Sequence, residues 1–310
     1  MIKPQNRSEI SMEVLKRQVF QGILVLAALT GVFFLFRPWI REAGAKKDLL
    51  EFWTAGSYGE AYEKSREGLA KNPMDPFFLT MNGFCSYQLA LTQISEAGSL
   101  VYIDECIRSL RKALLGKNAD KDGRIRYVLG KGYYLKGPEY ADLAVKYLEE
   151  AKAVPYEAGD LGEYLGLAYS AVKDYRKSIE ALTASLNPQD QGADSDLLLL
   201  YIAQSYMGLE DWDTARAYLK RCAEQSRDTE IVLKSTILLG KALYNSGDSD
   251  GALAAFESVL ETGGENAEAS FEIGEIYAAR GDTIRARAAW RRARRADPNY
   301  GPVLSRLNTI

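Results

Sequence analysis

A short sequence pattern recurs along this chain of 310 residues and restricts its fold more than any other feature. In each copy an aliphatic residue precedes a small residue, and a tyrosine or leucine follows three positions after the small one. The copies lie 34 to 37 residues apart, a period typical of proteins built from repeated supersecondary units. Such a chain buries its core by stacking each unit on the next. The small residue of the pattern is Gly130, Gly166, Ala203, Gly240 and Gly274 in successive copies.

The second half of each copy predicts a helix. A small residue follows the turn, and apolar residues come after it at the spacing of one helix face, as Phe256 and Val259 do after Ala252. Proline follows several of these segments and ends the helix, because the residue before a proline avoids helical dihedral angles. The small residues of the second halves are Ala61, Cys106, Ala144, Ser178, Ala215, Ala252 and Ala286.

The last copy of the pattern is the most complete. It resembles the tetratricopeptide repeat (TPR), a helix–turn–helix unit of about 34 residues with the pattern W-x2-L-G-x2-Y…A-x3-F…P. The residues of the last copy that carry this resemblance are Ile273, Gly274, Tyr277, Gly281, Ala286, Trp290, Ala293 and Pro298.

The resemblance implies an all-α TPR solenoid of about seven helix–turn–helix repeats over residues 46–299. Within each repeat, the Gly or Ala of the first helix is expected to let the small residue of the second helix approach closely. The second repeat carries about eleven additional residues near 91–101, which we expect to form a loop, because insertions in such repeats map to loops. Residues 300–310 are expected to form a partial capping helix at the C-terminal end.

An apolar segment of 18 residues without a charge, Val19–Phe36, lies near the N-terminus. A membrane-spanning helix needs about 20 apolar residues, and the apolar core of a cleaved signal peptide is shorter, about 7–15 residues. We therefore expect a transmembrane signal anchor at 19–36, preceded by a short basic tail at 1–18 and followed by a linker at 37–45.

The orientation of this anchor is not set by charge, because four Lys or Arg residues lie close to the segment on each side. A short tail followed by a large domain is the layout of a bacterial signal anchor. By that analogy we expect a single-pass protein of the inner (cytoplasmic) membrane with a periplasmic TPR domain. A cytoplasmic orientation remains the alternative.

The resemblance also indicates where partners bind, since the first helix of each TPR lines a concave surface. The residues projected onto that surface are mostly aromatic, methionine and lysine side chains, which suit an extended or helical peptide. The repeated Lys and Asn positions with which some TPR proteins hold a C-terminal carboxylate are not found. The predicted partner-binding residues are Phe77, Phe84, Tyr87, Tyr127, Lys131, Tyr134, Gln204, Met207, Lys241 and Tyr244.

Charge is segregated along the chain. Residues 49–279 contain 23 basic and 36 acidic residues, whereas residues 280–310 contain 8 basic and 2 acidic ones. The basic cluster is interpreted either as a dock for an acidic protein surface or anionic lipid, or as a solvated helix face at the end of the array. Net charge gives no overall case for nucleic-acid binding. The predicted docking patch is Arg285, Arg287, Arg291, Arg292, Arg294 and Arg295.

Composition argues against several classes of chemistry. The chain contains no histidine, which removes Ser-His-Asp and Cys-His catalysis and histidine-ligated zinc. Its three cysteines form no C-x-x-C motif, so a four-thiolate metal site is excluded. The repeats leave no room for a catalytic domain. We therefore expect neither an enzyme nor a cofactor, metal or small-molecule substrate.

The sequence thus predicts a membrane-anchored TPR scaffold that binds protein partners through its solenoid surface. The resemblance favours assembly or organisation of a bacterial envelope complex, such as envelope biogenesis or a periplasmic flagellar-collar structure. Two alternatives stay open: a cytosol-facing membrane-tethered adaptor or import receptor, and a non-catalytic subunit that regulates an enzyme.

Overall fold

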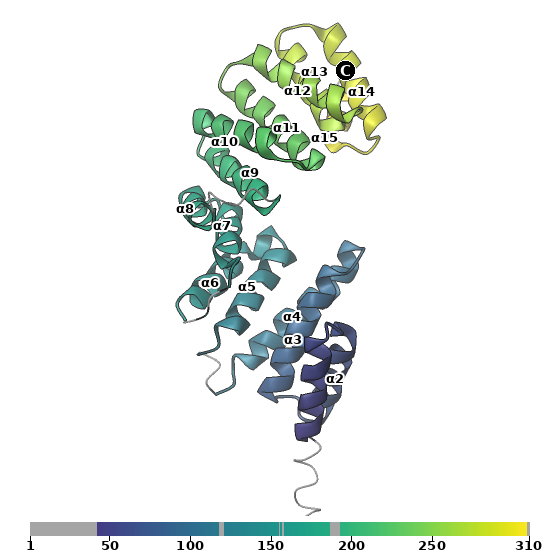
Figure 1. Ribbon diagram of the computed structural model, residues 1–310. Coiled ribbons are helices and arrows are strands. Elements are labelled where there is room, and N and C mark those ends of the chain that lie inside the picture. The colour runs from purple at the N-terminus through teal and green to yellow at the C-terminus, as the bar shows by residue number, and fades with distance from the viewer. Residues whose placement is uncertain (1–41, 118–120, 155, 157, 187–192, 309–310) are drawn as a thin grey trace, which may run out of the picture. The chain divides into compact units, whose positions relative to one another are not determined.

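The computed structural model is built from helices throughout the part of the chain that it describes (Figure 1). The predicted tail at 1–18 and anchor at 19–36 lie outside the described residues. Among the residues that are described, no helix has the length and apolar character needed to cross a membrane. The described residues are 42–117, 121–154, 156, 158–186 and 193–308.

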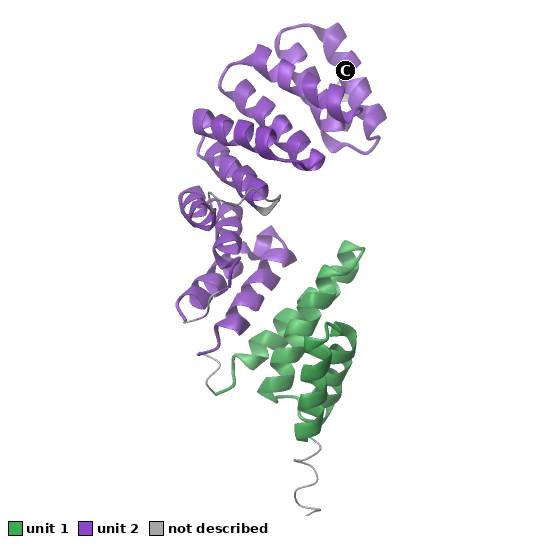
Figure 2. Ribbon diagram, viewed as in Figure 1, with its two compact units in different colours: residues 1–119 green, residues 120–310 purple. Residues whose placement is uncertain are grey.

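The chain divides into two compact units, one before and one after residue 120 (Figure 2). Four helices make up the described residues of the N-terminal unit. Its first helix covers 42–54 and so includes the end of the segment that was predicted as a linker. Lys46 stabilises this start by ion pairs with Glu42 at 2.7 Å and with Asp75 at 3.0 Å. The other helices are α2 (Tyr58–Lys71), α3 (Pro76–Leu91) and α4 (Glu96–Ala113).

In the C-terminal unit, the residues that the structure describes form five helix pairs and a final helix. In each pair the first helix packs against the second, and the second packs against the first helix of the next pair. The first helices are α5 (Gly123–Lys136), α7 (Leu161–Ala171), α9 (Ala193–Gly208), α11 (Thr229–Asn245) and α13 (Ala267–Ala279). The second helices are α6 (Ala141–Lys152), α8 (Tyr175–Ser185), α10 (Trp212–Gln225), α12 (Ser249–Gly263) and α14 (Thr283–Ala296), and α15 (Gly301–Asn308) follows.

The glycines of the first helices mark the places where the two helices of a pair come closest. A Cβ added at Gly166 would lie 2.4 Å from Cγ of Leu182, and one added at Gly274 would lie 2.4 Å from Cδ1 of Trp290. In both pairs, the side chain nearest to the glycine belongs to a large residue of the second helix. This large residue lies one helical turn after the small residue, such as Ser178, that was expected to face the glycine. At the small residue the backbones of the two helices come close to each other, since the carbonyl oxygen of Ser178 would be 3.2 Å from a Cβ added at Gly166.

The turns of the last four repeats follow one design. Seven residues after the small residue of the first helix, the backbone adopts a positive φ, and an aspartate then caps the second helix. Gly247 has φ 92° and Asp248 accepts a hydrogen bond from the backbone N–H of Gly251 at 2.8 Å. In two repeats the positive φ falls on Lys173 (63°) and Glu210 (60°), where a Cβ makes it costly.

The additional residues of the second repeat do not form the loop that was expected at 91–101. Only residues 92–95 separate α3 from α4, and residues 96–101 belong to α4, which is 18 residues long. Ser95 caps this helix by accepting a hydrogen bond from the N–H of Gly98 at 3.1 Å. Because residues 96–101 contain no proline and follow a good capping residue, adding turns to the helix satisfies their backbone groups.

Helix α15 lies where the sequence predicts a capping helix. Its Val303 is fully buried and packs with Trp290 and Ala293 of α14. An ion pair of Arg306 with Glu275 of α13 adds a polar contact, with Nε 3.0 Å from Oε1. The end of the helical array is therefore covered by a short, mainly exposed helix.

Candidate functional site: the inner surface of the C-terminal unit

The first helices of the C-terminal unit form a continuous layer. Helix α5 contacts α7, α7 contacts α9, α9 contacts α11, and α11 contacts α13, although a second helix intervenes in the sequence each time. Side chains from successive repeats therefore lie next to one another on this layer. We call the exposed side of this layer the inner surface.

Lys131 of α5 is the centre of a polar cluster on the inner surface. Its Nζ donates hydrogen bonds to Oδ2 of Asp160 at 2.9 Å and to the hydroxyl oxygen of Tyr127 at 3.0 Å. It also lies 4.1 Å from the ring centroid of Tyr164. The Tyr127 hydroxyl donates a further short hydrogen bond to Asp160. Lys131 is only 8 % exposed, so its charge is balanced inside the protein.

The electrostatics of this cluster follow from its burial and its hydrogen bonds. Burial alone would raise the pKa of Asp160, but the hydrogen bonds from Tyr127 and Lys131 outweigh it and hold that pKa below its usual value. Burial and the neighbouring carboxylate both raise the pKa of Tyr127 far above its usual value. At neutral pH Asp160 is therefore ionised, and Tyr127 is a neutral phenol that bridges it to Lys131.

Three tyrosines form an aromatic surface beside this pair. The ring centroids of Tyr134 on α5 and Tyr164 on α7 are 5.8 Å apart, and the planes meet at 88°, the edge-to-face arrangement that aromatic pairs favour. Tyr201 on α9 is near enough to Tyr134 to affect its titration. Burial raises the pKa of both Tyr134 and Tyr201, with Glu163 contributing in the same direction. All three rings remain partly exposed, so they offer contact area to a partner.

The sequence prediction placed Tyr134 on this surface but did not include its neighbours Tyr164 and Tyr201. Both stand two positions before the small residue of their repeats, Gly166 and Ala203. The projection from sequence used the positions six and three before and one and four after that residue. The signal was present, since the position two before is tyrosine in two successive repeats.

Lys241 of α11 repeats the arrangement of Lys131. Its Nζ lies 2.6 Å from Oε1 of Glu268 and 3.3 Å from Oε1 of Glu272, both on α13. In both cases a lysine one position after the small residue pairs with a carboxylate six positions before the small residue of the next repeat. Burial raises the pKa of Glu272 despite the attraction of Lys241.

The remaining predicted partner-binding residues occupy different environments. Gln204 of α9 is partly exposed, whereas Met207 of α9 and Tyr244 of α11 pack at the edges of apolar clusters. In the N-terminal unit, Phe77 and Phe84 of α3 pack against the local core.

Tyr87, also on α3, is only 5 % exposed, so it presents almost no surface to a partner. Within the C-terminal unit, the structure thus brings Tyr127, Lys131 and Tyr134 together on α5, whereas Lys241 belongs to a second polar cluster on α11.

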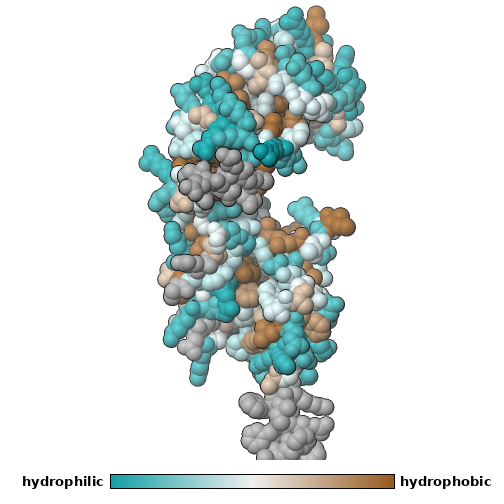
Figure 3. All heavy atoms as spheres, viewed as in Figure 1, coloured by the Kyte–Doolittle hydropathy of each residue, from teal (hydrophilic) through white to brown (hydrophobic). Residues whose placement is uncertain are grey.

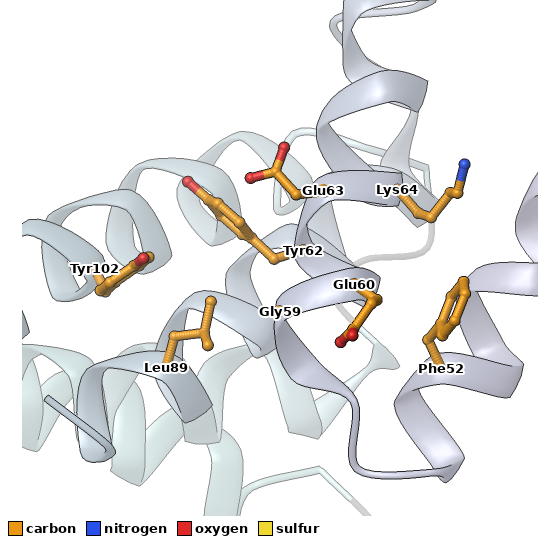
Figure 4. A pocket seen from close by; sticks show the side chains of 8 residues that line it. All are labelled: Phe52, Gly59, Glu60, Tyr62, Glu63, Lys64, Leu89 and Tyr102. Atoms are coloured by element: carbon orange, nitrogen blue, oxygen red, sulfur yellow. The ribbon is translucent and has the colours of Figure 1, made fainter.

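The N-terminal unit has a groove of its own, which sequence reasoning did not find. It has a volume of about 520 Å³ and an aromatic wall in which the rings of Tyr62 and Tyr102 meet edge to face, 5.8 Å apart (Figure 4). Carboxylates stand at its rim. The lining residues are Phe52, Gly59, Glu60, Tyr62, Glu63, Lys64, Leu89 and Tyr102.

The predicted arginine patch lies on α14. Arg285, Arg287, Arg291, Arg294 and Arg295 are exposed, and Arg292 is partly buried. Arg285 is near Asp282, with 3.5 Å between Nε and Oδ2, and its guanidinium lies 5.4 Å from the ring centroid of Tyr277.

On the face of the molecule in Figure 3, hydrophilic residues predominate and hydrophobic residues are scattered among them in small patches.

Comparisons with known proteins agree with this architecture. Two tetratricopeptide-repeat family models match residues 198–229 and 237–301. None of the curated proteins searched matches the chain.

Solved structures share the fold at low sequence identity. The C-terminal part of a TPR repeat-containing protein from Cytophaga hutchinsonii is similar with a TM-score of 0.58 and 17% identity, covering 84% of this chain and 98% of that one. A tetratricopeptide repeat protein from Parabacteroides merdae gives a TM-score of 0.55 and 18% identity, covering 85% and 96%. A Rap protein complexed with Competence and Sporulation Factor gives 0.54 and 16%, covering 83% and 76%.

Proposed function

Because this chain belongs to the tetratricopeptide-repeat superfamily, we propose that it is a scaffold that binds a segment of a partner protein on the inner surface of its C-terminal unit. The observation that carries the proposal is the partly exposed aromatic surface of Tyr134, Tyr164 and Tyr201, which three different repeats contribute. Large, rigid aromatic side chains are enriched where binding energy is concentrated in protein interfaces.

The charges beside this aromatic surface favour an apolar or aromatic contact as the main one. Lys131 is already paired with Asp160, and Lys241 with two glutamates, so neither needs a partner anion. A segment held by its terminal carboxylate is therefore disfavoured at these two lysines. That a similar fold was solved in complex with Competence and Sporulation Factor supports the idea that this architecture holds a bound partner.

The scaffold is further proposed to be tethered to a membrane by Val19–Phe36 and to help assemble a bacterial envelope complex. The support is the 18-residue uncharged segment alone. The proposed arrangement places the repeats in the periplasm, next to the membrane in which the partner complex is assembled.

Binding on the inner surface is testable by photo-crosslinking in cells. A photoreactive phenylalanine analogue replaces Tyr201 in the full-length chain, and illumination should yield a defined protein adduct. Tyr134→Ala combined with Tyr164→Ala should remove most of that adduct, because the contact area is lost. The matched variants Tyr134→Phe and Tyr164→Phe keep the rings and should preserve it. An adduct that survives the alanine changes would contradict the proposal.

The tether is tested separately. Deletion of residues 1–36 should move the protein from the membrane fraction to the soluble fraction. Protease added after only the outer membrane is opened should digest the repeats of the full-length protein. Protection of the repeats would instead support the cytosol-facing adaptor.

A further inference from the structure

The exposed side of α14 carries a continuous row of side chains that the helix pairs do not use. The packed side of α14 is apolar, since Ala286, Ala289, Trp290 and Ala293 are all buried. On the opposite side, Ile284 is 82 % exposed, and Ala288 and Arg291 are exposed as well. The row consists of Ile284, Ala288, Arg291 and Arg295, with Arg287 and Arg294 beside it.

The spacing of this row matches a helix–helix contact. Its members stand at i, i+4, i+7 and i+11, which keeps them on one stripe of a helix, and the row extends over about 16 Å. Ile284 and the small Ala288 give the N-terminal part an apolar seam that another helix can approach. The C-terminal part offers only guanidinium groups.

Within the described part of the chain, no carboxylate pairs with an arginine of the row. Among the residues that the structure describes, the ion pair found for an arginine of α14 is that of Arg285 with Asp282, outside the row. Helix α14 contains six arginines and neither lysine nor an acidic residue. Arginine differs from lysine in its planar fork, which pairs with carboxylates through two parallel hydrogen bonds. The row is therefore a preformed set of donors for carboxylates.

We propose that this row binds an acidic helix of a partner protein, with Ile284 and Ala288 against its apolar side chains and Arg287, Arg291, Arg294 and Arg295 paired with its carboxylates. This surface is distinct from the inner surface and does not depend on it. It makes the protein a two-sided adaptor, in which α14 recruits a second partner.

Other anionic partners fit the row less well. A helix that inserts into lipid presents a broad apolar face, but the apolar face of α14 is turned into the core. A nucleic acid or a lipid surface extends well beyond about 16 Å. It would then face the other repeats of the C-terminal unit, which are acidic, with 28 acidic and 16 basic residues over 120–279. A short acidic helix avoids that repulsion.

The first test uses a defined probe in solution. A synthetic helical peptide with leucine and glutamate on one face should bind the full-length chain, and its affinity should fall with rising salt. Arg291→Glu combined with Arg295→Glu should weaken binding by at least about tenfold, since both pairs are lost and repulsion is added. Ile284→Asp should weaken it as well, which a purely electrostatic contact would not require.

Matched controls keep the proposal falsifiable. Lys220→Glu combined with Arg221→Glu reverses two exposed cations on α10, the equivalent helix of another repeat, and should leave the affinity within about twofold. The same peptide with lysine in place of glutamate should not bind. The proposal is overturned if reversal on α14 has no more effect than reversal on α10, or if phosphatidylglycerol vesicles or duplex DNA bind the row and the peptide does not.

Discussion

The two sides of the C-terminal unit use their cations in opposite ways. On the inner surface, Lys131 and Lys241 are paired with carboxylates of the following repeat. On the outer side of α14, Arg291 and Arg295 project into solvent on an exposed stripe. A cation that is neutralised within the fold holds repeats together, whereas a row of exposed arginines is free to contact another molecule. The difference indicates that the inner lysines are structural, so the recognition proposed for this surface has to rest on the tyrosines.

The pairing on the inner surface is a property of the repeat register. The lysine directly follows the small residue of one first helix, such as Gly130. The carboxylate that it reaches lies six positions before the small residue of the next first helix, such as Gly166. Lys131 reaches Asp160 and Lys241 reaches Glu268 in this way. Glu275 occupies the lysine position in the last repeat and pairs with Arg306 of the capping helix, so the polarity is reversed at the end of the array.

The largest effect is expected from removing the packing that both surfaces need. Gly166→Leu forces a large side chain into the space that Leu182 occupies, where even a Cβ would be 2.4 Å from Cγ of Leu182. The free energy of unfolding should fall by about 3 kcal/mol. Chemical denaturation monitored by circular dichroism measures it. Gly59→Leu on α2 is the matched control, since nothing lies within 4 Å of its added Cβ, and an equal loss there would contradict the packing account.

The next largest effect separates structural from available cations. Asp160→Asn leaves the buried Lys131 without its counter-ion and should lower the free energy of unfolding by about 2 kcal/mol. Lys131→Met keeps an apolar stem of similar length and leaves Asp160, whose side chain is 39% exposed, accessible to water. We expect Lys131→Met to cost less. Equal stability of Asp160→Asn and the parent protein would show that the pair is not structural.

The same pair predicts a pH dependence. The folded-state pKa of Asp160 is lowered, so the stability that its charge provides is fully present above the unfolded pKa of about 3.9. It is lost as the pH falls through the lower folded pKa. Between about pH 5 and about pH 2, the parent protein should therefore lose more stability than Asp160→Asn. Parallel curves for the two proteins would exclude this role of Asp160.

The smallest effect on stability is expected on the outer side. Arg291→Glu combined with Arg295→Glu changes two exposed side chains and should alter the free energy of unfolding by no more than about 0.5 kcal/mol. Binding of the acidic helical probe should weaken by at least about tenfold in the same protein. A large loss of stability would mean that these arginines serve the fold, as the inner lysines do.

Sequence reasoning could predict the helical repeats because their spacing and small residues reflect close packing. It could also place Tyr127, Lys131 and Tyr134 on one surface, since all three belong to one helix. It could not show that Lys131 is neutralised, because Asp160 lies 29 positions away and reaches it only through the stacking of repeats. The same reason hid Tyr164 and Tyr201, whose contribution depends on how far each helix rotates in its layer.

The extension of α4 was missed for a different physical reason. Additional residues in a repeat can either loop out or lengthen the helices around the turn. The capping oxygen of Ser95 and the absence of proline in 96–101 favour the second outcome. A local capping signal therefore decided the structure more than the length of the inserted segment did.

Parallel photo-crosslinking from the two sides tests the central claim most directly. The photoreactive analogue is placed at Tyr201 in one full-length protein and at Ala288 in another, and the adducts formed in the same cells are compared. The account predicts protein adducts from both positions. The adduct from position 201 should be lost only when Tyr134 and Tyr164 are replaced. The adduct from position 288 should be lost only when the charges of Arg291 and Arg295 are reversed. Position 201 yielding no protein adduct, or one that depends on the α14 arginines, would contradict it.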